Sequence, residues 1–271
     1  MRKYLTYLTL LALSLCWIPH TSYGYVRSQG EKNKVFLYWN QLPAPFHINS
    51  AGSPNANKLL TYQAIQKGFS TWNAVTCSCF SFQYKGLTSS TVLGYDINHP
   101  NDNINLIIFQ TKKWPHISNA VGVTSTIYNQ NTGEIIAFDM ELNNITYLFS
   151  INGKPIKNKS GFLQPTIDIQ NTVTHEAGHA LGLDHTLNFA ATMYASAPPG
   201  ETSKRTLHQD DINGLCAVYK KTTQGTCDIA VNQQDLKQGC QCHTEPHHYP
   251  DNTIIILSLL ILFSFIRLYP K

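Results

Sequence analysis

The stretch from Asn171 to Met193, NTVTHEAGHALGLDHTLNFAATM, carries histidine, glutamate and glycine residues at spacings that suit a metal centre. His175 and His179 are separated by one helical turn, so their imidazoles project from the same face of a helix and can bind one ion. Glu176 lies about 100° further round that helix, where its carboxylate can reach a metal-bound water rather than the metal. This arrangement predicts a metal ion that activates water, with Glu176 taking up the proton.

A third ligand is expected beyond the end of this helix. Gly182 follows His179 at the position where a residue with positive φ would end the helix and turn the chain back. His185 would then return to the metal as a third nitrogen ligand; Asp184 is the rival, and the offset from Gly182 favours His185. The alternative is a helix whose histidines merely lie on a surface. Gly182 and His185 at their offsets make a chance match far rarer than H-E-x-x-H alone, which favours the metal site.

Apolar patterning predicts the elements that must position this stretch. The segments with the composition of strands are KVFLYW (34–39), FSFQY (80–84), INLIIF (104–109), AVGVTSTIY (120–128) and EIIAFDMEL (134–142). INLIIF is nearly all apolar, which predicts a central strand, whereas the alternation in VGVTSTI predicts an edge strand. Helical spacing covers residues 59–74, the histidine stretch and residues 208–220. The expected fold class is α+β: a twisted mixed sheet of about five strands with three main helices.

The N-terminal segment and the central part of the chain differ in composition. Residues 1–24 combine Arg2 and Lys3 with an apolar run and small residues at the end, which is the pattern of a secretory signal; the run is short for a membrane anchor. Residues 25–221 contain no internal repeat and no low-complexity linker. They are long enough to form a single catalytic-size domain.

The C-terminal segment is expected to be a polar linker over residues 222–252 and a hydrophobic tail over residues 253–271. The apolar run of the tail, TIIILSLLILFSFI, is shorter than the ~20 residues of a relaxed transmembrane helix, so a buried core helix is the alternative. The polar linker and the uniformly apolar run favour a membrane or sorting tail. The histidines between His243 and His248 lie in the linker, where a solvated spacer is expected rather than a second metal site.

The cysteine and charge content limits which disulfides, further metal sites and partners are expected. The cysteines after the signal are Cys77, Cys79, Cys216, Cys227, Cys240 and Cys242. An even number in an exported chain favours disulfides, although six cysteines allow 15 connectivities and neighbours at i and i+2 rarely bridge each other. A four-cysteine zinc site is the alternative, but the spacings do not match the usual zinc-ribbon pattern. The net charge is +4 without a run of lysine or arginine, so no nucleic-acid partner is expected.

At this point the sequence resembles a known family. HEAGHALGLDH is similar to the metzincin zinc peptidase signature H-E-x-x-H-x-x-G-x-x-H, and Met193 stands where a Met-turn is expected. The likeness is closest to the matrixins, in particular to bacterial matrixin-like secreted peptidases. It rests on the spacing from His185 to Met193, on the last helix HQDDINGLCAVY, and on the segments FHINSAG, TWNAVTCSCFSF and FDMELN. It spans most of residues 35–220.

The resemblance implies a site and a mode of substrate binding. His175, His179 and His185 would bind one catalytic Zn²⁺, Glu176 would act as general base, and Met193 would form an apolar floor beneath the zinc rather than a ligand. The expected edge strand, near residues 121–127, would bind an extended peptide by strand addition.

The sequence also departs from the matrixin pattern. Only about ten residues separate the expected signal from the first expected strand, and no cysteine-switch motif occurs there, so latency by that route is not expected. The histidine of a structural zinc site is replaced around Phe138, which puts a second zinc in doubt. Asp139 and Glu141 could bind Ca²⁺, but solvated acids at a strand end are the favoured interpretation. Residues 144–166 look like an insertion that could border the cleft.

Two functions of different classes follow. The favoured one is an exported zinc metalloendopeptidase that hydrolyses peptide bonds in protein or peptide substrates. It would be attached to the cell surface or outer membrane through its tail, or secreted, and monomeric by default. The alternative is a surface binding or adhesion protein that keeps the scaffold and a structural zinc. The intact Glu176 argues against this alternative, because a structural zinc has no use for that carboxylate. A zinc hydrolase of non-peptide substrates would be expected to have a different ligand order.

Overall fold

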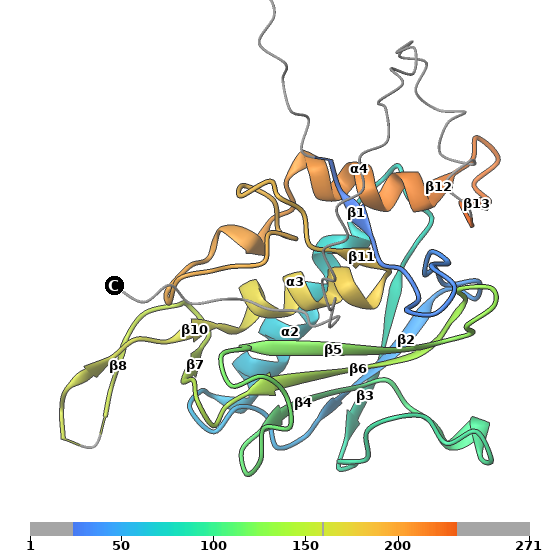
Figure 1. Cartoon of the computed structure of the whole chain (residues 1–271). Helices are drawn as coiled ribbons and strands as arrows, with labels where there is room; N and C mark the ends of the chain where they lie inside the picture. The colour runs from blue at the N-terminus through green and yellow to red at the C-terminus, as the bar shows by residue number, and fades with distance from the viewer. Residues whose placement is uncertain (1–23, 159, 232–271) are drawn as a thin grey trace, which may run out of the picture.

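The computed structural model describes residues 24–158 and 160–231, and its centre is a five-stranded sheet (Figure 1). The strands lie in the order β3 (Phe82–Thr88), β2 (Ala44–Asn49), β4 (Leu106–Gln110), β6 (Ile135–Asn143) and β5 (Gly122–Tyr128). The first four of these strands run parallel, and β5 pairs antiparallel with β6. The predicted mixed sheet of five strands is therefore confirmed.

Two strands occupy the positions that their patterns predict. β4 lies between β2 and β6, and its side chains from Leu106 to Phe109 are all buried, as expected for a central strand. β5 forms an edge, because within the described ranges it pairs only with β6. Figure 1 shows that β5 runs beside helix α3 (Ile169–Ala180). The free edge of the sheet is thus next to the histidine helix.

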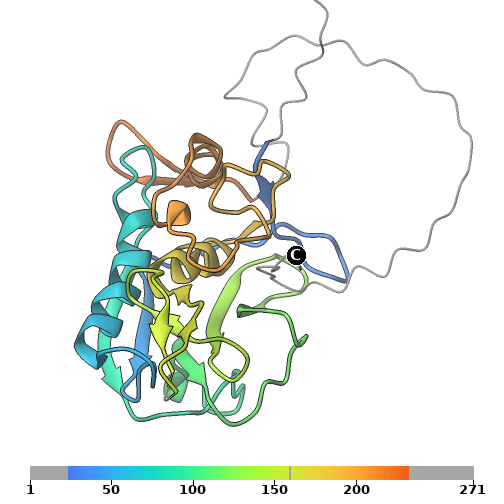
Figure 2. The ribbon, with the colours of Figure 1, turned by 90° about the vertical axis from the view of Figure 1, so that its left-hand side faces the viewer.

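Helices α2 (Lys58–Asn73) and α3 pack against each other on one face of the sheet (Figure 2). The side chain of Asn57 caps the first turn of α2. Gly68 permits the close approach of the two helices, since a Cβ at this position would lie 2.7 Å from Val173 Cγ1. The third predicted helix is α4 (Gln209–Val218), which begins with a capping box. All three main helices are confirmed.

The first predicted strand, KVFLYW over residues 34–39, is wrong. Within the described residues this segment forms only isolated bridges, and the sheet strand is β2. Apolar side chains of the segment are buried against the end of α3 instead, where Trp39 Nε1 donates to the Ala180 carbonyl at 2.8 Å. β2 was not among the predicted strands, and it contains Pro45, which cannot donate to a strand ladder. Its pairing with β4 begins only at His47, so Pro45 removes no ladder hydrogen bond there.

Two disulfides attach the C-terminal part of the described chain to the segment that follows α2. Cys77 bonds to Cys216 of α4, and Cys79 bonds to Cys227. The disulfide interpretation is correct for these four cysteines, and Cys77 and Cys79 are not bridged to each other. Each bond closes a long loop, which restricts the unfolded chain more than a short loop would.

A short hairpin follows α4. β12 (Tyr219–Lys221) pairs antiparallel with β13 (Cys227–Ile229), and β13 lies within the stretch expected to be a linker. Cys240, Cys242 and the histidines of the linker lie outside the described residues, as do residues 1–23 of the expected signal and the whole tail. In the part of the chain that the structure describes, no helix has the length and apolar character needed to cross a bilayer.

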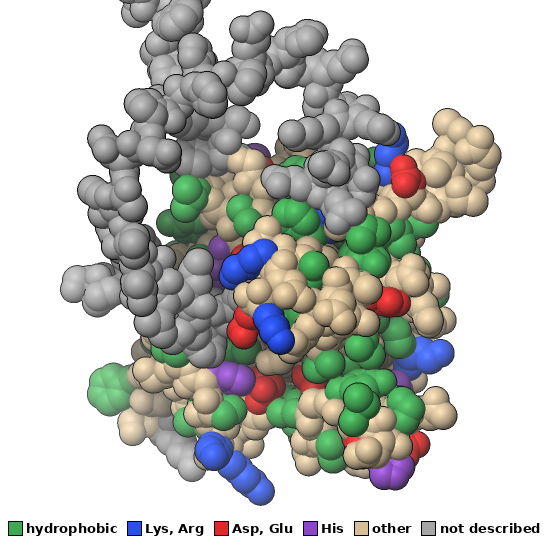
Figure 3. Space-filling model, turned by 45° about the vertical axis from the view of Figure 1, so that its right-hand side comes forward, with side chains coloured by type: hydrophobic (Ala, Val, Ile, Leu, Met, Phe, Trp, Pro, Cys, Tyr) green, Lys and Arg blue, Asp and Glu red, His purple; other side chains and the backbone are tan. Residues whose placement is uncertain are grey.

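The remaining elements are short. They are β1 (Val26–Arg27) with β11 (Leu183–Asp184), β7 (Phe149–Ser150) with β10 (Ile167–Asp168), β8 (Ile156–Lys157) with β9 (Leu163–Gln164), and the 3₁₀ turns η1 (Pro100–Asp102) and η2 (Ser203–Arg205). β7, β8 and β9 lie within residues 144–166, the segment expected to be an insertion, and the β8–β9 hairpin extends away from the body of the domain (Figure 1). On the face in Figure 3, lysine and arginine side chains lie singly rather than in one basic cluster.

Candidate active site

Helix α3 carries two of the predicted ligands and is buried along almost its whole length. Asp168 caps its first turn, with Oδ1 accepting a hydrogen bond of 2.8 Å from the Asn171 backbone N–H. At the other end, Gly182 has a φ of +104°, and a Cβ there would lie 2.7 Å from the Leu37 carbonyl oxygen. Glycine meets both requirements, so the helix ends here and the chain turns back as predicted.

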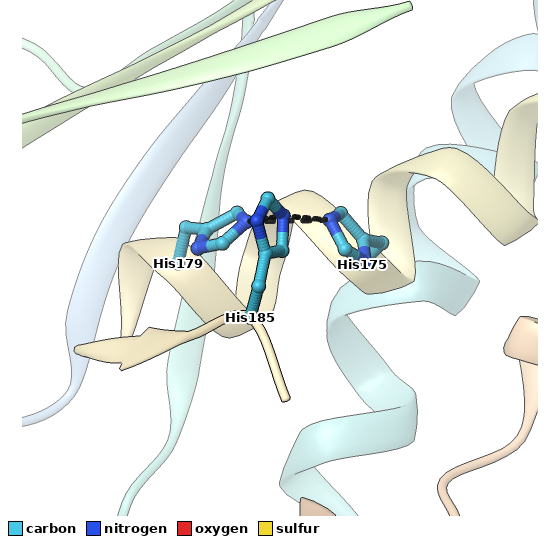
Figure 4. A group of neighbouring side chains, drawn as sticks. All are labelled: His175, His179 and His185. Atoms are coloured by element: carbon cyan, nitrogen blue, oxygen red, sulfur yellow. Dashed lines mark hydrogen bonds between the residues drawn. The ribbon is translucent and has the colours of Figure 1, made fainter. Parts of the chain in front are cut away.

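This turn brings His185 beside His175 and His179 (Figure 4). The three Nε2 atoms lie 3.1, 3.2 and 3.2 Å from one another. Asp184, the rival ligand, is not part of this cluster; its Oδ1 accepts a hydrogen bond of 2.7 Å from the His185 backbone N–H. The structure thus brings together the three imidazoles that the sequence analysis favoured.

The tautomers of two of the imidazoles follow from their backbone partners. His175 Nδ1 lies 2.7 Å from the Thr192 carbonyl oxygen, and His179 Nδ1 lies 2.9 Å from that of Leu183. A carbonyl can only accept, so each Nδ1 carries the proton and each Nε2 presents a lone pair. The contact between these two Nε2 atoms is therefore not a hydrogen bond. The two lone pairs point towards each other and repel, and a bound cation would remove this repulsion.

The spacing of the cluster fits a zinc ion. Zn–N bonds of about 2.0–2.1 Å in tetrahedral geometry place ligand nitrogens roughly 3.3–3.4 Å apart, close to the separations seen here. Burial lowers the pKa of His175 and His179, while burial and the neighbouring His179 lower the pKa of His185 to about 2. These shifts favour the neutral imidazole, which is the form that binds a metal.

Glu176 projects from α3 towards the edge strand β5. Its Oε2 accepts a hydrogen bond of 2.8 Å from Thr124 Oγ1, and its Oε1 is buried without a hydrogen-bond partner among the described residues. Gly122 makes room for it, since a Cβ there would lie 2.8 Å from Oε1. Burial raises the pKa of Glu176 to about 8, and a divalent cation nearby would oppose this shift by favouring the carboxylate. One carboxylate oxygen is thus anchored and the other is free to take a proton.

Met193 lies beneath the histidine helix and is buried. A Cβ at Gly178 would lie 2.2 Å from Met193 Sδ, so the helix and the methionine side chain are in direct contact through this glycine. Asp211 of α4 holds the turn in place, because its two carboxylate oxygens accept from the backbone N–H groups of Thr192 and Met193 at 2.8 and 3.0 Å. Met193 contacts the helix from below and is not among the clustered metal-ligand atoms.

Three supporting residues were not singled out in the sequence. Thr124 and Gly122 lie in the predicted edge strand, and Asp211 lies in the predicted last helix. The start of α4 reads HQDD, without the Ser or Thr of the capping-box pattern, so the sequence held no capping-box signal for Asp211. The sequence held no local signal for Thr124, because its contact with Glu176 joins residues 52 positions apart.

Asp139 is buried in β6, so its interpretation as a solvated acid at a strand end is wrong. Its two oxygens accept from the backbone N–H groups of Gly94 and Leu106 at 2.6 and 2.9 Å. Asp139 therefore fastens the loop between β3 and β4 to the sheet. The reason is topological: β6 is an inner strand, and its middle residues lie under that loop.

Glu141 is also buried, which corrects the same interpretation for this residue. Its oxygens contact Gln110 Nε2 at 2.6 Å and His116 Nε2 at 2.8 Å. Every carboxylate oxygen of Asp139 and Glu141 thus has a protein partner, and this donor set does not fit a calcium ion. Phe138, where the resemblance would place a zinc histidine, is fully buried in the aromatic core.

Three converging imidazoles beside a buried carboxylate define a mononuclear three-histidine metal site, and comparison with known proteins agrees. The matrixin family model, Peptidase_M10, matches residues 38–220. A metalloendoproteinase 1 from Glycine max is 46% identical over 52 residues, or 19% of this chain and 17% of the relative. Metalloendoproteinase 1-MMP of Arabidopsis thaliana is 33% identical over 84 residues, or 31% and 23%. Matrix metalloproteinase-27 of Tupaia belangeri is 28% identical over 217 residues, or 78% and 35%.

The chain belongs to the matrixin family. The match covers most of the described domain and includes the histidine helix, the Met193 turn and α4. The matched region spans between 17% and 35% of the length of these three relatives.

Proposed function

We propose that this chain is an exported zinc-dependent endopeptidase. His175, His179 and His185 would hold the zinc ion, and Glu176 would be the general base. The observation that carries the proposal is the pairing of two features on one helix: converging Nε2 lone pairs, and a carboxylate with one free oxygen. Membership of the matrixin family supports the same reaction.

The chemistry assigns distinct roles to the groups. When bound, zinc supplies Lewis acidity for activating water and polarising a peptide carbonyl. Glu176 Oε1 accepts the proton of the attacking water and then donates it to the leaving amine. Thr124 keeps the other oxygen, Oε2, in place throughout. The backbone carbonyls of Thr192 and Leu183 orient the imidazoles of His175 and His179.

The edge strand β5 provides the substrate-binding surface. One side of β5 pairs with β6, and its other edge runs beside the helix that carries Glu176. An extended peptide can add to this edge through backbone hydrogen bonds, which supply affinity with little dependence on side chains. This geometry favours protein and peptide substrates and brings the scissile bond close to Glu176.

Export is supported by two observations. Residues 1–24 have the composition of a secretory signal. The two disulfides within the described residues indicate an oxidising compartment. The same proposal includes attachment to a cell surface or outer membrane through residues 253–271, with release from the cell as the alternative. This part rests on the apolar sequence of that segment alone. A monomer is the default oligomeric state.

Hydrolysis of an unstructured protein by the purified chain, with zinc content measured on the same samples, tests the proposal. Glu176→Ala serves as the matched variant, because the three imidazoles stay intact. We expect the variant to lose cleavage while it keeps about one zinc per chain, as expected for a group that moves protons rather than binding the metal. If the folded wild type binds zinc but cleaves nothing across a broad substrate panel, the chain is a binding protein on a matrixin scaffold.

A further inference from the structure

We propose that the β8–β9 hairpin is a docking surface for an anionic lipid bilayer. The apolar part of this surface is the pair Phe162 and Leu163, whose side chains are 69% and 64% exposed. Exposed apolar side chains that are contiguous, rather than scattered singly, mark interaction sites. The hairpin extends away from the domain, so a flat surface can approach it without meeting the body of the protein (Figure 1).

The charge of the hairpin indicates which surface it fits. Between residues 151 and 165 the only charged side chains are lysines, and there is no aspartate or glutamate. Lys154 and Lys157 are exposed, and Lys157 lies directly across the strand pair from Leu163. Lysine next to an exposed apolar side chain allows the ammonium to contact acidic headgroups while the apolar group enters the acyl boundary. An anionic bilayer offers both partners at once.

The backbone of the hairpin tip is already hydrogen-bonded internally. The side-chain oxygen of Asn158 accepts from the N–H groups of Ser160 and Phe162, both at 3.0 Å. The Asn158 carbonyl accepts from Gly161 N–H at 2.9 Å, and Asn158 N–H donates to the Phe162 carbonyl at 2.9 Å. Peptide groups that are satisfied in this way lose less on leaving water. The described backbone N–H groups of Asn158, Ser160, Gly161 and Phe162 can therefore enter a headgroup region while they stay hydrogen-bonded.

The base of the hairpin is attached to the catalytic part of the domain. Thr166 Oγ1 donates to the Lys154 carbonyl at 2.9 Å, and the Thr166 carbonyl accepts from Gly200 N–H at 2.9 Å. Arg205 donates to the Ile151 carbonyl at 2.6 Å and pairs with Asp168, the cap of α3. A bilayer contact at the tip would thus fix the orientation of the histidine helix relative to the membrane.

A convex tip favours a bilayer over a protein partner. Two adjacent side chains bury too little area for a stable protein interface, whereas a bilayer accepts side chains one at a time. The inference does not depend on peptidase activity, so it can fail or hold separately from the proposed function.

A tryptophan introduced at the tip reports on the contact in the full chain. Phe162→Trp is compared with Val92→Trp, a control in another loop where the native side chain is 74% exposed. Difference spectra against the wild type remove the signal of the four native tryptophans. With vesicles of phosphatidylcholine and phosphatidylglycerol, we expect the emission of the tip variant to shift to shorter wavelength and to be quenched by lipids brominated on the acyl chains. The control variant should show neither change.

A charge variant and a substrate assay complete the test. Adding Lys154→Glu and Lys157→Glu to the tip variant should weaken its response to vesicles at least tenfold, and vesicles of phosphatidylcholine alone should give an equally weak response. A tip signal that vesicles leave unchanged, or that the control variant matches, overturns the proposal. A response that survives the two glutamates also overturns it. The double variant Phe162→Ser with Leu163→Ser is also assayed on a soluble protein substrate without vesicles. A raised KM in this variant overturns the proposal, because the tip would then bind substrate.

Discussion

Thr124 on the edge strand β5 donates a hydrogen bond of 2.8 Å to Glu176 Oε2 on helix α3. The same hydroxyl lies 3.1 Å from the Glu176 backbone carbonyl, so strand and helix are joined at this point. Gly122, on the same strand, leaves the space that Oε1 occupies. The strand expected to bind the substrate thus also orients the expected general base.

Replacing Thr124 with valine should lower kcat about ten- to a hundredfold. A hydrogen bond to a charged group contributes about 1.5–3 kcal/mol, and its loss frees the carboxylate to rotate. Thr124→Ser keeps the hydroxyl and should retain most of the activity. Steady-state kinetics on a peptide substrate, with zinc content determined on each variant, measures the effect. Unchanged kcat in the valine variant would show that Thr124 does not position Glu176.

His185 and Asp184 should differ sharply as metal ligands. His185→Ala removes one of three clustered nitrogens and is expected to weaken zinc binding at least a hundredfold. Asp184→Asn should keep zinc binding close to the wild-type value, since an amide oxygen can still accept from the His185 N–H. Competition with a chromophoric chelator gives both affinities. The opposite order of effects would make Asp184 the ligand.

Removal of calcium should leave the domain unchanged. Both acids considered for calcium, Asp139 and Glu141, are satisfied by protein donors. The thermal midpoint in a chelator selective for calcium over zinc should therefore equal the midpoint with added calcium. A rise of several degrees on adding calcium would point to a site elsewhere in the chain.

The stability of the domain should respond to the titration of Asp139. Burial raises the pKa of Asp139 above its usual value of 3.8, so between these two values the folded state binds more protons than the unfolded state. This carboxyl therefore makes the free energy of unfolding fall as pH rises from 3.8 through the raised value. Denaturant unfolding of wild type and Asp139→Asn over this interval tests the sign. The wild type should lose stability relative to the variant with increasing pH, and a constant difference would contradict the shift.

The local features of the site were predictable because each depends on nearby residues. The helix over His175 and His179 follows from apolar spacing, and the turn at Gly182 follows from the backbone freedom of glycine. The central position of β4 and the edge position of β5 follow from their apolar patterns.

The failures of prediction share a different cause. Residues 34–39 have the composition of a strand, but the end of α3 offers their side chains a better site of burial than a ladder does. Asp139 and Glu141 are charged, which favours solvent in isolation, but donors from distant segments satisfy them inside the fold. Composition carries no information about partners that are far away in the chain.

The sequence by itself determined the helix, the glycine turn and the spacing of the three histidines, since these depend on backbone preferences within about a dozen residues. It also placed an edge strand among the expected elements. Only the tertiary structure decided that Thr124 holds Glu176, that Asp211 holds the Met193 turn, and which cysteines pair. These contacts join segments that are distant in the chain. The packing of the whole core brings the segments together, and local propensities do not encode that packing.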